Sequence, residues 1–500
     1  MRNESTETSH KTILKATGIF AFTQVFKIMI GVIGSKFVAV FLGPAGIGIL
    51  GLLNNTLAII GSVTGLGLNI SGVREVAMAS TEEDPIRFSS RLIILKRWSV
   101  MVGITGFLVT LLFSPLLSRL TFGSADYTIW FVMLAFNFIF SAVASSHAAI
   151  LQGLRMLKLF AVSNVISSFL VAVVTVPIYY FFRMEGIVPA LFLASSINLL
   201  VNWYFTRNLI PEKVSITLAE TIAKGKPLLK IGFLLSLNVI FGQLCVYCIK
   251  WYLNGSGSTS EILGLYEVST VILVSYVGMI FNAMGTDFYP RLTAIAKDNG
   301  KVRTLVNDQI EIALLLITPA ILFFYFLSPL IIELLYTKDF LGVLLILRAA
   351  LFAVIIKGVI WPLGFIILSK GNNMLYFVQE IISDLLNIAL TIGLYHYYGL
   401  IGIGIASVIH FALYGFYIYY IVNRNYNFSF RTETLRIIGG TVFLGSLATA
   451  VVFYMDYPYA YFPLGGLFII ATLFSSRQLN RKIDLKSYLE KIRDKIRKRS

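Results

Sequence analysis

Charged residues and cysteines are both scarce in this chain. Asp, Glu, Lys and Arg make up 13% of its 500 residues and hydrophobic residues 57%, which excludes an ordinary water-soluble globular protein. The two cysteines, Cys245 and Cys248, lie inside an apolar run. This position excludes a disulfide framework. The sequence also lacks the further residues that a redox or metal site would need beside the two cysteines. We therefore interpret both cysteines as core residues.

The sequence also lacks long hydrophilic segments and nucleotide-binding motifs. A membrane glycosyltransferase or polymerase needs a sizeable extramembrane loop with catalytic acids or bases, and the hydrophilic interruptions here are short. No glycine-rich loop of the kind that cradles nucleotide phosphates is present. We therefore expect neither an enzyme nor a cofactor. The N-terminus, Met1 to His10, is polar and shows no cleavage site, so we expect no removable signal peptide.

Long apolar stretches dominate what remains. Fourteen of them approach the length of about 20 residues with which a helix crosses a hydrocarbon core of about 30 Å. They lack the alternation of barrel strands, and only a helix satisfies its own backbone groups in lipid. We therefore predict an all-α polytopic membrane protein with about fourteen transmembrane helices. They are expected at 14–42, 46–71, 98–118, 128–150, 159–182, 187–206, 231–252, 263–285, 308–334, 343–368, 374–397, 401–422, 435–455 and 460–475.

The basic residues are distributed unevenly along the chain. Lys and Arg outnumber Asp and Glu by 41 to 25, which gives a formal net charge of +16. Outside the spans they concentrate in the N-terminal tail and in the loops after even-numbered helices. This asymmetry predicts that both termini are cytoplasmic, with the loops around Gly43, Asp126 and Lys338 on the opposite side. It also argues against nucleic acid as a partner, because the charges mark topology and do not gather into a fold that reads bases.

Short segments recur in the same order about half a chain apart. The letters SPLL at 114–117 return as SPLI at 328–331, and Arg74 after the second span has its counterpart in Arg291 after the eighth. We therefore predict two six-helix bundles related by an axis along the membrane normal, which enclose a central cavity and alternate its access. The predicted organisation is an N-terminal bundle at 1–208, a cytoplasmic linker at 209–230, a C-terminal bundle at 231–423, two additional helices at 435–475 and a basic cytoplasmic tail at 477–500.

The predicted tail is strongly basic. Residues 477–500 hold ten Lys and Arg, with apolar residues spaced three or four apart. This pattern is typical of an amphipathic helix that lies on anionic membrane lipids, and the alternative is a disordered, solvated tail.

A glycine-containing turn near the first two spans carries a family resemblance. The run from Phe37 to Gly48 reads FVAVFLGPAGIG and is followed by Gly65-Leu66-Gly67 and Val73-Arg74-Glu75. In these residues and in its overall layout the chain resembles the Wzx-type flippases of O-antigen synthesis, which belong to the multidrug/oligosaccharidyl-lipid/polysaccharide (MOP) exporter superfamily. The resemblance implies movement of undecaprenyl-pyrophosphate-linked repeat units from the cytoplasmic to the periplasmic leaflet of a bacterial inner membrane. It also implies a polysaccharide polymerase and a chain-length regulator as partners.

Lysines inside the spans are candidates for binding the diphosphate of such a substrate. An ionisable group at the centre of a span costs about 2.5–3.5 kcal/mol on insertion scales, so each one needs a reason. Lys27 lies mid-span and shares a helical face with Gln24, which is assigned to sugar binding. Lys27 either contacts the diphosphate or pairs with an acid. Lys357 is a second candidate, and Arg74 and Arg291 complete the predicted diphosphate set.

Acids inside the spans are candidates for gating or ion coupling. Lys250 and Glu267 lie at similar predicted depth, where they form either a structural ion pair or a gate that opens with the cavity. Glu380 and Asp384 share a helical face and either bind a coupling cation or proton, or pair with Lys357 on the neighbouring helix.

Asparagines in the second span are the weakest candidates. Asn54 and Asn55 bind sugar hydroxyls in one interpretation and make interhelical hydrogen bonds in the other.

Two transport functions compete. A flippase of lipid-linked oligosaccharide predicts a cavity with net positive charge, because a pyrophosphate must be desolvated against Lys or Arg. A MATE-like ion-coupled exporter of small molecules predicts that acids dominate. The excess of intramembrane lysines favours the flippase.

Overall fold

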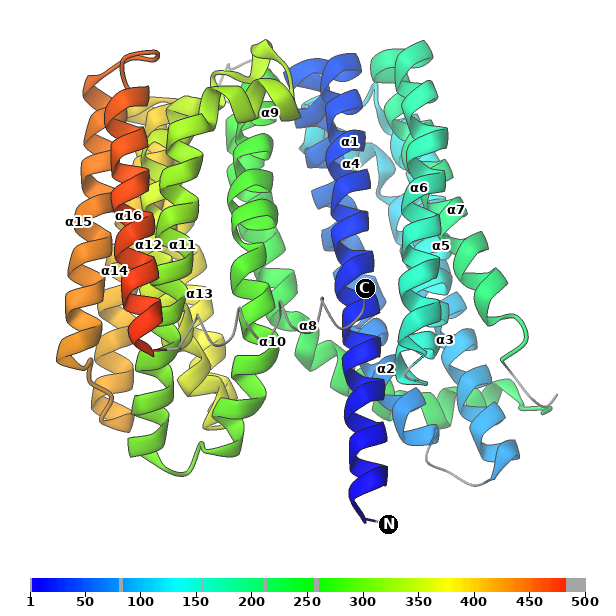
Figure 1. The fold of residues 1–500 in the computed structure, drawn as a ribbon. Helices are drawn as coiled ribbons and strands as arrows, with labels where there is room; N and C mark the ends of the chain where they lie inside the picture. The colour runs from blue at the N-terminus through cyan, green and yellow to red at the C-terminus, as the bar shows by residue number, and fades with distance from the viewer. Residues whose placement is uncertain (1, 81–83, 155, 210–213, 256–259, 483–500) are drawn as a thin grey trace, which may run out of the picture. The chain divides into compact units, whose positions relative to one another are not determined.

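The computed structural model consists of helices joined by short turns (Figure 1). It describes residues 2–80, 84–154, 156–209, 214–255 and 260–482, with the side chains of 2–28, 69–70, 157, 227–235, 286 and 482 left aside. No strand occurs in the described ranges. Most of the predicted basic tail, 483–500, lies outside the described residues. The prediction of an all-α polytopic membrane protein is confirmed.

The helices gather into two compact units. The first holds residues 1–264 and 335–337, and the second holds 265–334 and 338–500. The helices that begin in the first unit are α1(Arg2–Gly65), α2(Leu68–Ala79), α3(Pro85–Leu112), α4(Ser114–Phe122), α5(Thr128–Gly153), α6(Leu157–Phe182), η1(Arg183–Gly186), α7(Ile187–Thr206), α8(Leu218–Gly255) and α9(Ser260–Thr270). Those of the second are η2(Val271–Val277), α10(Met279–Ala294), α11(Asn299–Leu335), η3(Lys338–Phe340), α12(Val343–Ser369), α13(Asn373–Tyr398), α14(Leu400–Tyr426), α15(Thr432–Tyr454) and α16(Tyr461–Lys482).

Each of the fourteen predicted spans coincides with helix. Within the described residues, eleven stretches are long and apolar enough to cross a membrane. One of the eleven, Lys158–Thr206, contains two predicted spans, and another, Met29–Gly65, overlaps the first two. The predicted seventh span lies in α8. The shortest predicted span, 460–475, is part of α16, whose stretch from Tyr461 to Arg481 meets the same criterion.

Glycine explains the bend that divides α1 into two spans. Gly43 has φ of 64° and ψ of −173°, a conformation that side chains with a Cβ rarely adopt, and Pro44 follows it. Gly264 approaches this bend so closely that a Cβ on it would lie 1.8 Å from the carbonyl oxygen of Pro44. The α1 helix ends at Gly65, because Leu66 and Gly67 both have positive φ before α2 begins.

The third span differs from its prediction, 98–118. Helix α3 begins earlier, at Pro85, where the Asp84 carboxylate accepts hydrogen bonds from the backbone N–H groups of Ile86 and Arg87. It ends at Leu112, and the separate helix α4 starts with a proline in its first turn. The apolar run continues through this break, so hydropathy alone placed the end of the helix too late.

Helix α8 also begins earlier than its predicted span at 231–252. Thr217 and Glu220 form a reciprocal cap, because the Glu220 carboxylate accepts from the Thr217 N–H at 2.9 Å and the Thr217 hydroxyl accepts from the Glu220 N–H at 3.2 Å. The Thr217 backbone N–H lowers the pKa of the Glu220 carboxyl. Part of the predicted linker 209–230 is therefore the first part of α8. Sequence analysis placed α8 with the second bundle, whereas the structure groups it with the first unit.

Glycines allow close packing within the first unit. On α3, a Cβ at Gly103 would lie 2.9 Å from the Cα of Ile139, and one at Gly106 would lie 2.8 Å from the Cβ of Phe138. Helices α3 and α5 therefore pack with their backbones close together, as small residues permit in membrane bundles.

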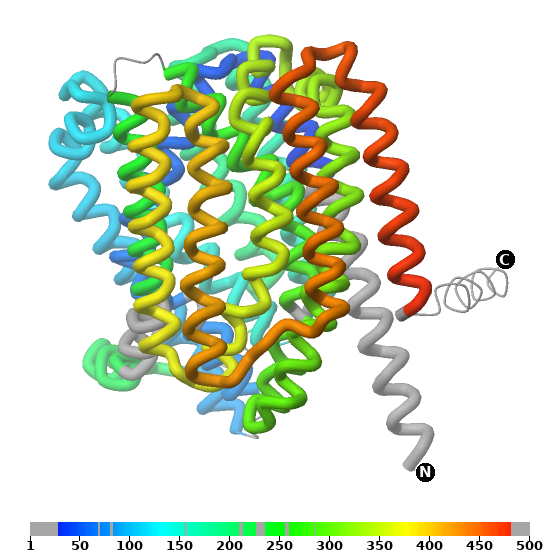
Figure 2. The backbone as a smooth tube through the Cα atoms, turned by 90° about the vertical axis from the view of Figure 1, so that its left-hand side faces the viewer, coloured from blue at the N-terminus to red at the C-terminus, as the bar shows by residue number. Residues whose placement is uncertain are grey.

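The two helices after the predicted duplication pack onto the rest of the second unit. Near its start, α15 contacts α11 through an ion pair between Arg431 and Asp308 and a hydrogen bond from Thr434 to the buried Glu311. In the turn before α16, the Tyr457 hydroxyl donates to the Tyr325 carbonyl at 2.7 Å. In Figure 2, α13 and α14 run side by side in the same unit, coloured yellow and orange.

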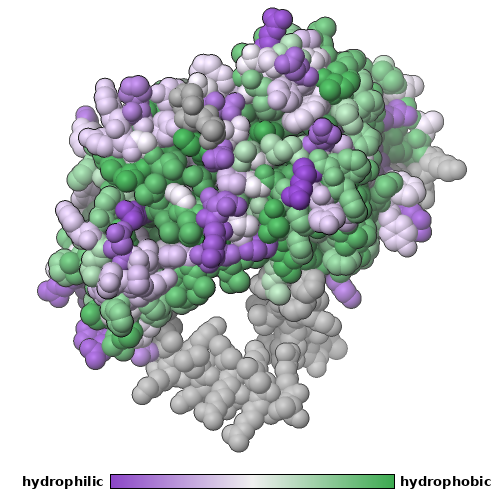
Figure 3. All heavy atoms as spheres, turned by 90° about the horizontal axis from the view of Figure 1, so that it is seen from above, coloured by the Kyte–Doolittle hydropathy of each residue, from purple (hydrophilic) through white to green (hydrophobic). Residues whose placement is uncertain are grey.

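Large apolar side chains cover much of the outer surface. Leu112, Phe416 and Phe462 are among many that are exposed, as expected for helices that face lipid. Seen from above, the ends of the helices carry hydrophilic side chains, purple in Figure 3, among hydrophobic ones.

Candidate functional site

Polar side chains join α1 to α8 inside the first unit. Lys250 is only 6% exposed, and its Nζ donates to the carbonyl oxygen of Gly51 at 3.2 Å. Seven residues earlier on α8, Gln243 accepts a hydrogen bond from Asn55 Nδ2 at 2.6 Å. Because seven residues are about two helical turns, Lys250 and Gln243 lie on one face of α8, and Gly51 and Asn55 lie on one face of α1. We call this row of contacts the α1–α8 seam.

Of the two predicted sugar-binding asparagines, only Asn55 belongs to the seam. Its side chain is 5% exposed, and its Oδ1 has no hydrogen-bond partner among the described residues. Asn54 is exposed, since neighbouring residues on a helix point in different directions. The structure therefore separates the two candidates.

The side chains of Lys27 and Gln24 lie outside the described residues. The glycines predicted to share their face are described, and a Cβ added at Gly31 or Gly34 would meet no atom within 4 Å. This part of the α1 face is therefore not covered by closely packed side chains.

A basic hollow lies among α2, α3 and α8. Its volume is about 430 Å³, and its walls include Glu75, Arg87, Arg91 and Lys224. Arg91 pairs with Glu75 inside it, so the hollow keeps an excess of positive charge. Sequence analysis treated the arginines as topology signals, because a count of basic residues does not reveal which of them share a concave surface. The predicted diphosphate ligand Arg74 is exposed on α2, one residue before Glu75.

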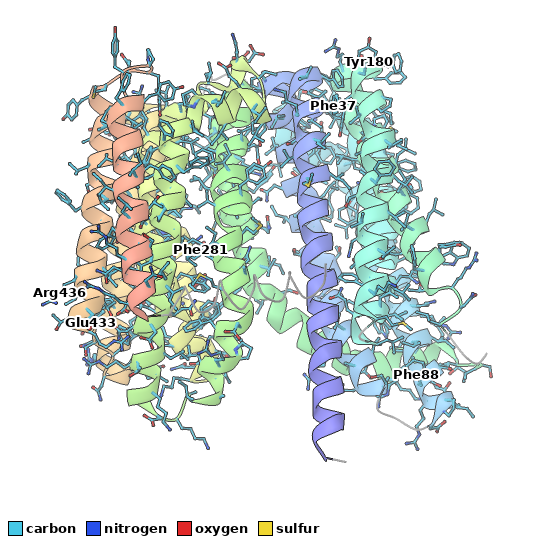
Figure 4. The ribbon with its side chains drawn as sticks, viewed as in Figure 1. Phe37, Phe88, Tyr180, Phe281, Glu433 and Arg436 are labelled. Atoms are coloured by element: carbon cyan, nitrogen blue, oxygen red, sulfur yellow. The ribbon has the colours of Figure 1, made fainter. Side chains whose placement is uncertain are left out.

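In the second unit, Lys357 of α12 lies between two aromatic rings. Its Nζ is 5.5 Å from the ring centre of Phe281 and 5.7 Å from that of Phe411. Figure 4 labels Phe281 on α10. Within the described part of this unit, no ion pair joins Lys357 to Glu380 or Asp384. The two aromatic rings are neighbours of the ammonium group at these distances. The two alternatives for the acids, binding a coupling cation or proton or pairing with Lys357, stay predictions.

Glu380 instead belongs to a hydrogen-bonded cluster on α13 and α14. Gln379 Nε2 donates to Glu380 Oε1 at 3.1 Å, and the Tyr414 hydroxyl donates to Gln379 Oε1 at 2.7 Å. His410 Nε2 and the Ser383 hydroxyl are 3.0 Å apart one turn away. Asp384 is half-buried on the same helix. The predicted acidic stripe thus exists, and it is embedded in neutral partners that the apolar pattern alone could not indicate.

The remaining candidates are dispersed. Arg291 is exposed and pairs with Asp287 on its own helix at 3.0 Å. Lys250 belongs to the first unit and Glu267 to the second, so their predicted pairing stays a prediction. In the described ranges no group of three or more His, Cys, Asp or Glu side chains could hold a metal ion. Both cysteines are free thiols, and Cys245 is buried. Cys248 is exposed, so its interpretation as a core residue is wrong.

Comparison with known sequences places the chain. A sequence model of the family described as "Polysaccharide biosynthesis protein" matches residues 37–345. The chain belongs to this polysaccharide biosynthesis family. The match includes the glycine-containing turn at Gly43, the part of α1 that forms the α1–α8 seam, and all of α8. No curated protein sequence matches the chain significantly.

Solved transporters share the fold of this polysaccharide biosynthesis protein. A lipid II flippase, MurJ, in an inward closed conformation is similar with a TM-score of 0.70 and 16% identity, over 93% of this chain and 99% of that one. An inward-facing multidrug resistance MATE transporter of the MOP superfamily is similar with a TM-score of 0.64 and 15% identity, over 80% of this chain and 95% of that one. A MOP superfamily transporter from Pyrococcus furiosus is similar with a TM-score of 0.59 and 16% identity, over 82% of this chain and 96% of that one. The predicted membership of a polysaccharide-type family with the MOP fold is confirmed.

Proposed function

We propose that this protein flips an anionic lipid-linked oligosaccharide from the cytoplasmic to the periplasmic leaflet of a bacterial inner membrane. The substrate is an undecaprenyl-pyrophosphate-linked repeat unit of O-antigen or a related surface polysaccharide. Family membership in polysaccharide biosynthesis and a fold similar to that of a lipid II flippase support this choice. The protein acts as a transporter that makes and breaks no covalent bond.

The environment of Lys357 is the observation that carries the proposal. This cation lies well inside a helix of high hydropathy, between two aromatic rings, and among the described residues no acid lies at ion-pair distance from it. A positive charge in such surroundings costs free energy unless an anion lies beside it and neutralises it. A diphosphate supplies that anion only while the substrate is bound, so Lys357 gains most of its electrostatic stabilisation during transport.

Other basic groups extend the diphosphate path. Lys27 supplies a second cation on the face of the first span that the helical spacing predicts, and Arg74 within α2 and Arg291 near the end of α10 lie on the predicted cytoplasmic side. The basic hollow lined by Arg87, Arg91 and Lys224 provides an entry point for the headgroup at the membrane surface. In this proposal both termini are cytoplasmic, and the two halves rock to expose the substrate to alternate sides.

Competitive binding tests the substrate class. The purified protein in nanodiscs is offered radiolabelled undecaprenyl diphosphate carrying an oligosaccharide, against either unlabelled undecaprenyl diphosphate or a lipophilic organic cation. The proposal predicts that the diphosphate lipid displaces the label and that the cation does not. Displacement by the cation alone would assign the protein to the competing class of exporters.

The second candidate function, a MATE-like ion-coupled exporter of small molecules, rests on the Glu380 cluster. Two acids on one face of α13, with Tyr414 and His410 beside them, suit a site that exchanges a proton or cation. The same cluster serves the flippase as its coupling element. Transport of organic cations driven by an ion gradient in proteoliposomes would favour the exporter.

A further inference from the structure

The first unit contains a cavity of about 330 Å³ among α1, α2, α3, α5 and α8. Hydroxyl side chains dominate its polar lining, and none of its described lining residues is charged. The hydroxyls come from Ser62, Thr64, Ser99, Ser141, Ser145, Ser146 and Ser236. This volume is far more room than one water molecule or one bare cation needs. We call it the hydroxyl cavity.

Several hydroxyls of the hydroxyl cavity already donate their hydrogen to their own helix. Thr64 donates to the Ile60 carbonyl at 2.8 Å, and Ser99 donates to the Leu95 carbonyl at 2.9 Å. Ser146 donates to the Val143 carbonyl at 2.8 Å. A hydroxyl with its hydrogen committed in this way offers its remaining lone pairs as acceptors. A ligand group that hydrogen-bonds to these three hydroxyls must therefore be a donor.

The α1–α8 seam continues into the hydroxyl cavity. On α1, the lining residues Ala58 and Ser62 follow Asn55 by three and seven residues, so the three share a face. On α8, the lining residue Val239 precedes Gln243 by four. The Asn55–Gln243 hydrogen bond therefore lies about one helical turn beyond the cavity walls. Asn55 Oδ1, buried and without a partner among the described residues, adds one more unsatisfied acceptor on this face.

These features select the chemistry of the ligand. An uncharged, acceptor-rich lining repels a diphosphate, whose oxygens are acceptors as well. It suits a neutral group with several O–H or N–H donors, and a cavity of this volume falls at the lower end of small-molecule sites. A sugar ring has that combination of size, neutrality and donors.

We propose that the hydroxyl cavity binds a neutral sugar residue of the lipid-linked oligosaccharide, while the cations elsewhere hold the diphosphate. This inference rests on the proposed function, because that function identifies the lipid diphosphate to which the sugar is attached. It makes the serines of α1 and α5, with Asn55, the residues that set preference for glycosylated over sugar-free lipid.

Binding to the full chain in nanodiscs tests the proposal. The probes are undecaprenyl diphosphate carrying one glucose, the same lipid carrying one N-acetylglucosamine, and undecaprenyl diphosphate alone. The wild-type protein should bind at least one glycosylated lipid about tenfold more tightly than the sugar-free lipid. Equal affinity for all three lipids would overturn the assignment.

Variants that fill the hydroxyl cavity test whether the preference for glycosylated over sugar-free lipid arises there. Ser145→Leu and Ser62→Leu should abolish the tenfold preference and leave the affinity for sugar-free lipid unchanged. The matched control is Thr105→Leu on α3, because Thr105 is exposed and also donates to its own helix, at 2.9 Å from the Met101 carbonyl. Retention of the preference in both serine variants would place the sugar elsewhere. Unchanged sugar-free affinity shows that each variant is folded.

The result also separates this inference from the proposed function. A protein that flips diphosphate lipids but binds glycosylated and sugar-free forms equally would retain the function and overturn the sugar site. A protein that flips no lipid, yet shows a sugar preference that Ser145→Leu removes, would retain the sugar site and lose the function.

Discussion

Asn55 Nδ2 donates to Gln243 Oε1 at 2.6 Å, and this hydrogen bond joins the second half of α1 to α8. The two residues are 188 positions apart in the chain. Together with the Lys250 contact to Gly51, the bond explains why α8 packs with the first unit although its sequence position suggests the second half. Side-chain hydrogen bonds of this kind contribute about 0.6–2 kcal/mol each between membrane helices.

Removing one partner of this bond should destabilise the first unit. Gln243→Leu leaves the buried Asn55 amide without its partner, so we expect a loss of about 1–2 kcal/mol in the free energy of unfolding. The double variant Asn55→Leu/Gln243→Leu should recover most of that loss, because neither polar group remains. Chemical unfolding in detergent measures the free energy of unfolding of the single and the double variant. A larger loss in the double variant than in Gln243→Leu would contradict the coupling between Asn55 and Gln243.

Backbone packing between α3 and α5 should be sensitive to a single methyl group. We expect Gly103→Ala to destabilise the protein by about 1–3 kcal/mol, because the added Cβ would overlap the backbone at Ile139. The matched control is Gly439→Ala on α15, where a Cβ meets nothing within 4 Å. Thermal unfolding of the two variants compares them directly. Equal midpoints would show that α3 and α5 do not pack this closely.

The sequence predicted the helices well and the polar contacts poorly. Apolar runs indicate helix because lipid leaves the backbone no other partner, and Gly43 correctly separated the first two spans. Breaks inside an apolar run, such as that at Phe113 between α3 and α4, change hydropathy little and were missed. Gln243 was overlooked as well, although an uncharged polar residue within a span was the available signal.

Partners of buried charges depend on helix neighbours that one sequence does not specify. Pairing with an acid on α13 was one of the two predicted alternatives, and neither alternative indicated that Phe281 and Phe411 lie near the Lys357 ammonium group. Depth along a helix could be predicted from the span limits, but rotation of the helix about its axis could not. The hydroxyl cavity was unpredictable for the same reason, since its serines come from helices far apart in the chain.

The predicted topology can be checked by labelling. In a background with Cys245→Ser and Cys248→Ser, a membrane-impermeant thiol reagent should label a cysteine at position 126 in intact cells and should leave one at position 297 unlabelled. The reason is that Lys and Arg concentrate on the predicted cytoplasmic side. Permeabilised cells provide the control, because both positions should then react. Labelling of 297 alone in intact cells would invert the topology.

Acids in the spans should couple transport to an ion gradient. Glu267, Glu380 and Asp384 are the candidates, and a carboxylate whose proton or cation affinity differs between two conformations biases which one is populated. We expect Glu380→Gln and Asp384→Asn to abolish gradient-driven accumulation in proteoliposomes and to leave equilibrium exchange of substrate intact. Accumulation by wild-type protein that is independent of every imposed gradient would make these acids structural.

Flipping in proteoliposomes tests the central claim most directly. Fluorescent undecaprenyl diphosphate carrying an oligosaccharide is incorporated into both leaflets, and an impermeant quencher reports how much of it reaches the outer leaflet over time. We predict rapid exchange with the wild-type protein and loss of most activity in Lys27→Ala and Lys357→Ala. Lys27→Arg and Lys357→Arg should keep partial activity, because the positive charge on the diphosphate path is retained. Exchange no faster than in protein-free liposomes, or full activity in both alanine variants, would contradict the account.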